Sequence, residues 1–313
     1  MIVVTGASGF LGSHISRKLV KEGESVRALV HNKETVFREQ RIQDLNIEII
    51  QGDVTKPDTL ISAFQGASAI LHTVAIAIEK GGRTYEEINY QGTVNVVEAA
   101  KAVGVKRIIN ICQLGADANL PYRFLASKGK AQDYVAASGL DWTAFRPSVI
   151  WGPEDEFANT FAKLVPITPL IFPIIGDGNA QFQPVWVDDV ATSVAKSLAA
   201  PDETIHKDYE LGGPDILTIE EIERRTLRAV GAKRTFIHFP IGLLRQIVAV
   251  METLLPSPPV TRSLLELLQV SNVTKNNGLK NFVDSPRPFT TENAAGYMQK
   301  FKVSETLAQF MGK

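Results

Sequence analysis

Apolar and polar positions follow two different rhythms over the first 150 residues. Short apolar runs typical of buried strands alternate with segments in which apolar residues recur every third or fourth position, as at Leu11, Ile15 and Leu19. Strands are expected at 2–5, 25–30, 47–50, 69–71, 107–111 and 142–145. Helices are expected at 58–65, 85–103 and 124–138, besides the first one, which Gly23 ends. This alternation predicts an α/β fold with a doubly wound, parallel Rossmann sheet.

The pattern loosens after Pro153, and we expect a smaller, partly helical C-terminal lobe there. The sequence predicts a Rossmann domain over 1–150 and a substrate or cap lobe over 151–313, with 183–199 returning to the sheet as a strand and a helix. Thr218 and Glu221 have the spacing of a capping box that opens another helix. The apolar segment 240–255 predicts a helix that packs in the lobe, with a membrane-surface or partner face as the alternative.

Composition narrows the class of protein. Hydrophobic residues make up 44% and charged residues 21% of the 313 residues, and the net charge is −1, which is ordinary for a globular chain and unsuited to non-specific nucleic-acid binding. The single cysteine excludes an intrachain disulfide, and His14, His206 and His238 show no ligand spacing, so no metal is expected. No secretory leader and no spanning segment are recognisable, so we expect a cytoplasmic location, with peripheral membrane association left open.

A glycine-rich loop directly after the first strand is the sharpest chemical signal. The segment Gly6-Ala7-Ser8-Gly9-Phe10-Leu11-Gly12 opens the first helix. In such loops the first glycine permits a tight turn, the second lets the backbone approach a pyrophosphate, and the third lets helix and strand pack closely. The N–H groups at the start of the helix favour the phosphates. The sequence therefore predicts a dinucleotide site here.

The end of the second strand indicates which dinucleotide is preferred. An acidic residue at this point grips the ribose hydroxyls of NAD, whereas basic residues accept the 2′-phosphate of NADP. This chain has His31, Asn32 and Lys33 and no acid. NADP(H) is favoured, and NAD(H) stays possible.

At this point the sequence resembles the extended and atypical short-chain dehydrogenase/reductases. The resemblance rests on residues 5–12 together with Gly52-Asp53-Val54, Asn89 to Thr93, Phe145 to Ser148 and Val187 to Val190, in the family's order. It implies that Asp53 and Val54 flank the adenine and that His72, Thr73, Val74 and Ala75 pass near the nicotinamide ribose. It also implies that Phe145, Arg146 and Pro147 lie beside the nicotinamide.

The same resemblance shows that the catalytic set is altered. The family uses a Tyr, a Lys four residues later on the same helical face, and a Ser or Thr at the end of the fifth strand. Lys128 matches the Lys and can hold the ribose, but Phe124 stands at the Tyr position and Cys112 at the hydroxyl position. Phenylalanine has no exchangeable proton. Tyr122 is a weaker substitute, because six helical steps separate it from Lys128 and the two would not share a face.

A narrower resemblance is to the atypical branch that includes the nucleotide-binding 39 kDa accessory subunit of respiratory complex I and its bacterial relatives. It rests on residues 114–117, 124–128 and 146–153 and on the Pro-rich 255–262. It implies a tightly bound NADPH with a structural or sensing role near quinone chemistry. Because the glycine-rich loop is intact and Phe124 replaces the Tyr, we expect a nicotinamide-nucleotide-binding protein with weak or absent dehydrogenase activity. The alternatives are an active NAD(P)H-dependent oxidoreductase acting on a quinone or carbonyl, and a redox-sensing scaffold for a protein partner. Apolar residues of the lobe indicate either an apolar, flat or quinone-like substrate or simply lobe core: Trp151, Phe157, Phe161, Leu164, Ile167, Leu170, Ile171 and Phe172.

Overall fold

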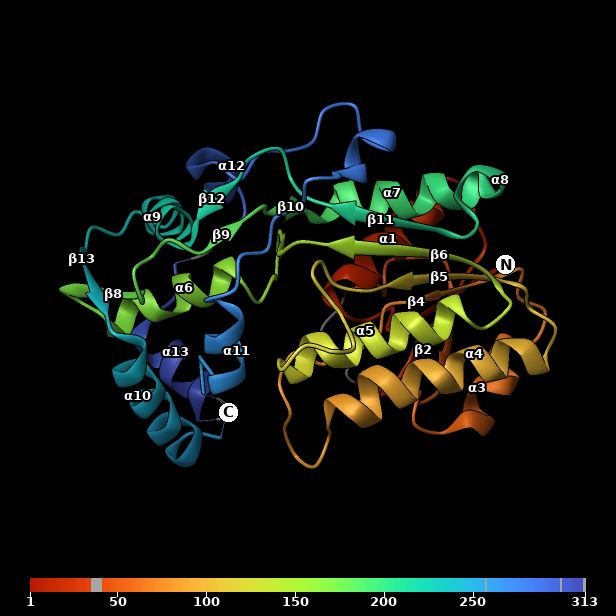
Figure 1. Cartoon of the computed structure of the whole chain (residues 1–313), viewed down its shortest axis with the longest axis horizontal. Helices are drawn as coiled ribbons and strands as arrows, with labels where there is room; N and C mark the ends of the chain where they lie inside the picture. Colours follow the sequence, from red (N-terminus) through yellow and green to blue (C-terminus); the bar gives the residue numbers. More distant parts are fainter. Residues whose placement is uncertain (35–40, 257, 299, 312–313) are drawn as a thin grey trace. The chain divides into compact units, whose positions relative to one another are not determined.

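The computed structural model describes residues 1–34, 41–256, 258–298 and 300–311, and it divides the chain into two compact units. The first unit contains residues 1–147, 187–211 and 276–285. The second contains residues 148–186, 212–275 and 286–313. Each is described by itself below (Figure 1).

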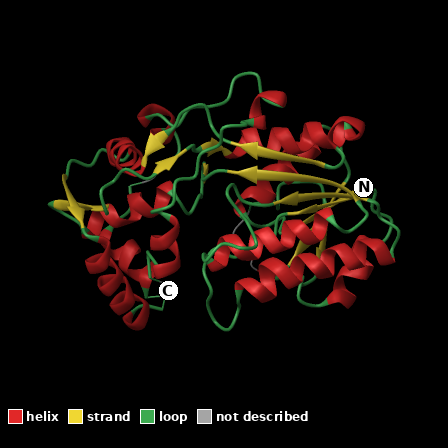
Figure 2. Cartoon of the chain, in the orientation of Figure 1, coloured by secondary structure: helices red, strands yellow, loops and turns green. Residues whose placement is uncertain are grey.

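The first unit is built on one sheet of seven parallel strands, coloured yellow in Figure 2. The spatial order is β11-β6-β5-β4-β1-β2-β3, and every neighbouring pair runs parallel. The strands are β1 (Ile2–Thr5), β2 (Val26–Val30), β3 (Glu48–Gln51), β4 (Ala69–His72), β5 (Arg107–Ile111), β6 (Asp141–Pro147) and β11 (Lys207–Leu211). The order reverses between β1 and β4, and α/β sheets of this kind bind ligands outside the carboxyl ends of the strands at such a point.

Helices cover both faces of this sheet (Figure 1). On one face α1 (Phe10–Lys21) packs against α7 (Val187–Ala199). On the other, α4 (Gly92–Ala102) packs between α3 (Pro57–Phe64) and α5 (Arg123–Ala136). The short elements of this unit are the π-helix η1 (Glu86–Gln91), α8 (Pro201–Thr204) and η3 (Gly278–Asn281). Fully buried Val3, Ile70, Ile108 and Val96 form part of the core beneath α3, α4 and α5.

The doubly wound parallel sheet predicted from the sequence is therefore confirmed, with one change inside a helix. The segment expected as a single helix over 85–103 begins as the π-helix η1 and continues as α4. π-Helical turns are rare and occur frequently at functional sites. Here the turn carries Asn89, whose side chain is fully buried.

The second unit is a smaller mixture of helices and two-stranded pairs. Its strands are β7 (Ile150–Trp151), β8 (Ile171–Ile175), β9 (Gln181–Phe182), β10 (Val185–Trp186), β12 (Leu217–Thr218) and β13 (Thr235–Phe239). They pair as β7 with β10, β8 with β13 and β9 with β12. Its helices are α6 (Ala158–Leu164), η2 (Val165–Ile167), α9 (Ile219–Ala229), α10 (Ile241–Leu254), α11 (Arg262–Leu267), α12 (Thr291–Ala295) and α13 (Val303–Phe310). The predicted capping box is present, since Thr218 and Glu221 bond to each other's backbone N–H groups at the start of α9.

The prediction that a strand at 183–187 returns to the large sheet is wrong. Residues in this stretch form β10, which pairs with β7 in the second unit, and the first unit regains the chain only at α7. The seventh strand of the sheet is β11, with the sequence Lys-Asp-Tyr-Glu-Leu. As an edge strand it is polar and partly exposed, so it lacks the apolar run by which central strands are recognised.

The apolar face of α10 is only partly used for packing. Val248 is the one residue of this helix that is buried, whereas Leu243, Val250 and Leu254 are exposed. Packing within the lobe therefore explains one side of α10 and not its whole apolar face. Among the described residues, no helix combines the length and the apolar character needed to cross a membrane.

Candidate functional site

The glycine-rich loop has no room for side chains at two of its three glycines. Gly6 has φ +74°, and a Cβ there would lie 2.7 Å from the Thr73 hydroxyl oxygen. A Cβ on Gly12 would lie 2.2 Å from the Gly6 carbonyl oxygen. Gly9, which is exposed, donates its N–H to the Gly6 carbonyl at 2.9 Å and begins the first turn of α1. At Gly9 the exposed surface is therefore backbone alone, as the close approach of a pyrophosphate requires.

The loop after β4 lies directly beside the loop after β1. In the sheet Thr5 is in register with His72, and the Thr73 hydroxyl donates to the Thr5 carbonyl oxygen at 2.7 Å. Thr73 and Val74 are half-buried, and Ala75 is exposed. The structure thus brings the predicted residues Thr73, Val74 and Ala75 to the edge of the sheet where the strand order reverses.

A hollow of about 830 Å³ lies at the carboxyl ends of β2 and β3. It is lined by His31, Asn32, Lys33, Glu34, Gln51, Gly52, Asp53, Lys56 and Thr59. The predicted 2′-phosphate residues and the predicted adenine residue Asp53 are therefore neighbours, and Lys56 adds a cation that the sequence prediction did not include.

Asp53 is held in place as an ionised carboxylate. Partial burial raises its pKa, but hydrogen bonds from the Thr55 N–H and hydroxyl and the charges of His31 and Lys56 outweigh this, so the pKa lies below its usual value. One carboxylate oxygen lies 3.3 Å from His31 Nδ1. Val54 beside it is buried, and Gly92 packs on its side chain so closely that a Cβ there would lie 2.9 Å from Val54 Cγ2.

Arg41 is a cation at the glycine-rich loop that sequence reasoning missed. Its guanidinium donates to the Ser8 carbonyl oxygen at 3.2 Å. Arg17 in turn donates to the Arg41 carbonyl oxygen and forms an ion pair with Asp44. No spacing rule connects residues 8 and 41, so only the folded chain reveals this neighbour.

A buried histidine fixes the end of β4. The His72 ring lies between the Thr5 and Thr93 hydroxyl oxygens, at 2.8 Å from Nδ1 and 3.0 Å from Nε2. The Thr93 hydroxyl donates to the Asn89 carbonyl oxygen, so it accepts from His72, which places the proton on Nε2. Burial, and secondarily the charge of Lys128, lowers the pKa of His72 to about 3. The ring is neutral, and it connects β1, β4 and α4.

Helix α5 carries Lys128 and Phe124, the positions that the sequence analysis assigned to the Lys and the Tyr of the catalytic set. Lys128 is buried and donates to the Ile111 carbonyl oxygen at the end of β5, at 2.6 Å. Desolvation lowers its pKa. Phe124, one turn earlier, is half-buried and packs edge-to-face on Tyr85 with the ring centres 5.7 Å apart. Ser127 is bonded by the buried Asn89 at 3.2 Å, so the π-helix supports α5 at this point.

Cys112 follows β5 directly, and Tyr122 directly precedes α5. Cys112 is buried, and burial raises the pKa of its thiol. Its Sγ lies 3.5 Å from the Lys128 carbonyl oxygen. Tyr122 is the extended residue that precedes the first turn of α5 and is half-buried. A neutral thiol at this place is a weak hydrogen-bond donor.

The residues at the end of β6 are part of the packing. Phe145 is fully buried, stacks on Tyr209 and meets the edge of Phe282. Pro147 is buried as well, and its carbonyl oxygen accepts from the Leu114 N–H at 2.9 Å. Arg146 bonds to Asp208 on β11 and to the Ala116 carbonyl oxygen. These contacts hold the loop after β5 against β6.

Within the described ranges, no group of three or more His, Cys, Asp or Glu side chains is arranged to hold a metal ion. The residues present fit a dinucleotide instead. The glycine cradle would be filled by a Cβ at Gly6 or Gly12, and the hollow at β2 and β3 adjoins polar and basic side chains. Fold and site together define a dinucleotide-binding Rossmann protein.

Comparisons with known proteins agree with this class. A family profile described as NAD(P)H-binding matches residues 6–162, and the chain belongs to this family. The chain is 26% identical over 288 residues to the mitochondrial NADH dehydrogenase [ubiquinone] 1 alpha subcomplex subunit 9 of Arabidopsis thaliana, covering 88% of this chain and 71% of that protein. It is 29% identical over 304 residues to the 2-alkyl-3-oxoalkanoate reductase of Stenotrophomonas maltophilia, covering 85% and 88%.

Among solved structures, a nucleoside-diphosphate-sugar epimerase from Staphylococcus aureus has a TM-score of 0.73 at 21% identity, covering 94% of this chain and 99% of that one. The UDP-glucose 4-epimerase of Thermus thermophilus in complex with NAD has a TM-score of 0.65 at 20% identity, covering 94% and 99%. These likenesses support the fold. The resemblance to the atypical short-chain dehydrogenase/reductases, including the complex I subunit, is confirmed.

Proposed function

We propose that the protein binds NADP(H) in preference to NAD(H) and carries out little of the ordinary alcohol–ketone chemistry of its family. The observation that carries this proposal is the combination of an intact glycine cradle and a buried Lys128 with Phe124 one helical turn before it. The residues that would bind the dinucleotide are present, whereas the Tyr that would transfer a proton is replaced by Phe124.

Each part of the binding half has a role that follows from its surroundings. The N–H groups between Gly9 and Gly12 face the pyrophosphate, and Arg41 adds positive charge beside Ser8. Asp53 and Val54 border the adenine. The Lys128 ammonium group has three donors. One bonds to the Ile111 carbonyl oxygen, and the other two have no acceptor among the described residues, so they suit ribose hydroxyls.

The preference for NADP(H) follows from charge at the end of β2. Lys33, Lys56 and His31 surround the hollow that adjoins Asp53. Asp53 itself is already engaged by Thr55 and lies beside His31, which reduces its repulsion of a phosphate. A cationic rim of this kind stabilises a 2′-phosphate by charge-assisted hydrogen bonds.

We expect little reduction of carbonyl compounds because no side chain at the catalytic positions, Phe124, Cys112 or Tyr122, is placed to supply a proton. When bound, the nicotinamide supplies or accepts a hydride. A carbonyl acceptor also needs a proton, and general acid catalysis contributes about 10²–10⁴-fold to such reactions. Phe124 has no proton to give, and Cys112 is a buried thiol with a raised pKa. His72 is neutral and bonded on both ring nitrogens.

Binding is tested by titrating the full chain, stripped of nucleotide, with NADPH and NADH by calorimetry. We expect NADPH to bind at least tenfold more tightly. Lys33→Asp is expected to remove most of this preference while leaving NADH binding nearly unchanged. Lys21→Asp makes the same charge change at the far end of α1 and is the matched control. Equal affinities in the native protein, or no binding of either nucleotide, would contradict the proposal.

Turnover is tested by substituting Phe124. We expect the native protein to oxidise NADPH at background rate with aldehydes, alkyl ketones and 3-oxo esters. Phe124→Tyr places a phenol four residues before Lys128 and is expected to raise the rate at least a hundredfold with an accepted carbonyl. Phe124→Leu is the control and gains nothing. A Tyr variant as inactive as the native protein would show that the acid is not the missing part.

A second function is reduction of an apolar carbonyl or a quinone. It is favoured by the reductases among the relatives, the 2-alkyl-3-oxoalkanoate reductase and, at 28% identity over 240 residues, the ceramide reductase of Caulobacter vibrioides. A quinone accepts a hydride and then takes a proton from water, so it needs no side-chain acid. NADPH oxidation above background that Phe124→Leu leaves unchanged would favour this function over the first.

A further inference from the structure

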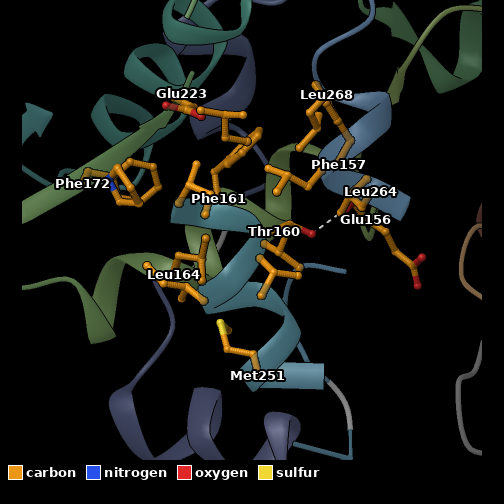
Figure 3. Close-up of a pocket in the computed structure, with 17 residues that line it drawn as sticks. Glu156, Phe157, Thr160, Phe161, Leu164, Phe172, Glu223, Met251, Leu264 and Leu268 are labelled. Carbon is orange, nitrogen blue, oxygen red and sulfur yellow. Dashed lines mark hydrogen bonds between the residues drawn. The ribbon is translucent and has the colours of Figure 1, made fainter. Parts of the chain in front are cut away.

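The second unit contains an apolar cavity of about 150 Å³. It lies among α6, β8, α9, α10 and α11, and Figure 3 shows Phe157, Phe161, Leu164, Met251 and Leu268 around it. Every lining residue belongs to the second unit. An apolar cavity of this size in another protein stays dry and binds benzene, so the space can hold a small hydrocarbon group.

The wall of this cavity is almost wholly hydrocarbon. Both carboxyl oxygens of Glu223 are buried and closed off from the cavity, and they have no hydrogen-bond partner among the described residues. The Thr160 hydroxyl donates to the Glu156 carbonyl oxygen, and the carboxylate of the exposed Glu156 points away from the cavity (Figure 3). The wall therefore offers no partner to a polar group inside the cavity.

The cavity has a closed part and a mouth. Phe161, Phe172, Val248 and Leu268 are buried and form its closed part. Ile247 of α10 also lines the cavity, but it is 43% exposed. A ligand can therefore enter beside the outer edge of α10 and reach the closed part with one end.

The exposed apolar face of α10 continues from this mouth. Leu243, Ile247, Val250 and Leu254 are exposed and recur every third or fourth position, so they form one stripe along the helix. A linear chain whose end fills the cavity can lie along this stripe. A compact ring would fill the cavity and leave the stripe in water, so the surface suits a chain better.

The charges of α10 favour a free molecule over a membrane surface as the source of the chain. The two charged residues of this helix form ion pairs with α11, Arg245 with Glu266 and Glu252 with Arg262. Helices that lie on membranes carry a basic face beside the apolar one. Over Ile241–Leu254, all of which the structure describes, α10 has no such face.

We propose that this cavity binds the alkyl chain of a free, linear, single-chain amphiphile, whose polar head stays in water at the mouth. The apolar wall stabilises the chain by burying it. A polar group at the buried end of the chain would lose its hydration without gaining a partner, so the cavity selects against it. The inference concerns binding and goes beyond the proposed function, since no lining residue belongs to the dinucleotide-binding unit.

The lining also separates two interpretations of the apolar residues noted in the sequence. Leu170 is exposed, and Trp151 is fully buried in the core of the unit, where it contacts Trp186 and Phe289. Four members of the set line the cavity: Phe157, Phe161, Leu164 and Phe172. The cavity is thus formed by part of the predicted set together with one side of α10.

The experiment uses straight-chain alcohols as probes. Binding of 1-butanol, 1-pentanol and 1-hexanol to the full chain, without dinucleotide, is measured by ligand-observed NMR and calorimetry. We expect the affinity to rise about fourfold with each added CH₂, which corresponds to about 0.8 kcal/mol for its burial. Hexane-1,6-diol should bind at least tenfold more weakly than 1-hexanol, because its second hydroxyl would be buried without a partner.

Two tryptophan variants show whether the alcohols occupy the cavity. Leu264→Trp fills it from α11 and should bind none of the alcohols. Ile216→Trp adds the same ring at an exposed residue outside the lining and should bind 1-hexanol like the native protein. Circular dichroism checks that both variants are folded. Equal affinities for the three alcohols, no binding of any of them, a diol that binds as tightly as 1-hexanol, or 1-hexanol binding that survives in Leu264→Trp would overturn the proposal.

Co-sedimentation with phosphatidylcholine vesicles tests the choice of a free molecule. We expect the native protein to stay in the supernatant. Vesicle binding that Leu264→Trp abolishes would overturn the proposal and assign the cavity to a lipid chain in a bilayer instead. NADPH titrations of the same samples are read separately, so loss of dinucleotide binding and loss of the alkyl-chain site are distinguishable.

Discussion

Gly12 lies in the first turn of α1, where the Gly6 carbonyl oxygen occupies the space of a side chain. Gly12→Ala forces the loop and the helix apart. We expect it to lower the free energy of unfolding by about 1–3 kcal/mol and to weaken NADPH binding at least tenfold. Urea denaturation and calorimetry measure the two effects.

The matched control for this substitution is Gly242→Ala in α10. A Cβ on Gly242 meets nothing within 4 Å, and alanine is favoured over glycine inside a helix by about 1 kcal/mol. Gly242→Ala should therefore leave the protein equally stable or slightly more stable, with NADPH binding unchanged. A Gly12→Ala protein that behaved like this control would show that the loop can relax.

Glu223 makes stability depend on pH in a definite direction. Its folded pKa lies above its unfolded value, so the stabilisation is complete below the unfolded pKa and is lost as the pH rises toward the folded one. Relative to Glu223→Gln, the native protein should therefore lose unfolding free energy between pH 5 and pH 8. Thermal unfolding across this range is the measurement.

Thr226→Val serves as the control for that pH dependence, because it removes another unpartnered buried oxygen of α9 without changing a titrating group. It should preserve the native slope of stability against pH. If Glu223→Gln shows the same slope as the native protein, the carboxyl group is hydrated or paired in solution.

At the scale of elements, β4 and its neighbours depend on an imidazole that must stay neutral. The folded pKa of His72 is about 3, against a usual value of 6.5. Below pH 6.5 His72 is protonated in the unfolded chain but stays neutral in the folded chain. The free energy of unfolding therefore falls as the pH falls toward 3. Between pH 7 and pH 4.5 the titration of His72 should lower the free energy of unfolding by on the order of 2–3 kcal/mol.

Urea denaturation at several pH values tests this dependence. His72→Gln should flatten the acid side of the stability profile. Thr93→Val, which removes one hydrogen bond of the ring but leaves the ring to titrate, should be less stable than the native protein while keeping its slope. An unchanged slope in His72→Gln would mean that other groups cause the acid sensitivity.

The central elements of the first unit were predictable because their apolar runs and periodicities are strong. β1 and β5 have the expected bounds, and those of β4 and α5 differ from the expected ones by at most two residues. β11 was not predictable, since its polar edge-strand sequence carries no such run. The cation at the loop, Arg41, and the buried carboxyl of Glu223 depend on contacts between distant segments, and no local pattern encodes those contacts.

At the scale of the whole molecule, the chain leaves the first unit after Pro147 and returns at Val187, and again at Asn276. Residues 187–211 and 276–285 both pack against the first segment of the unit. α7 covers α1, and Phe282 packs its ring against Phe145 and Tyr209. The dinucleotide-binding unit is therefore complete only when three separate pieces of sequence are present.

This interleaving has a consequence for biosynthesis. While residues up to about 150 have emerged from the ribosome, β6 has no partner on its outer side and the face of α1 that α7 covers is open. Unpaired strand edges and open apolar faces promote aggregation. A fragment ending at residue 150 should therefore be poorly soluble, whereas the full chain should be recovered in the supernatant, as sedimentation after expression would show. The nascent chain has to reach β11 before the nucleotide-binding sheet is complete, and residue 285 before the whole unit is complete.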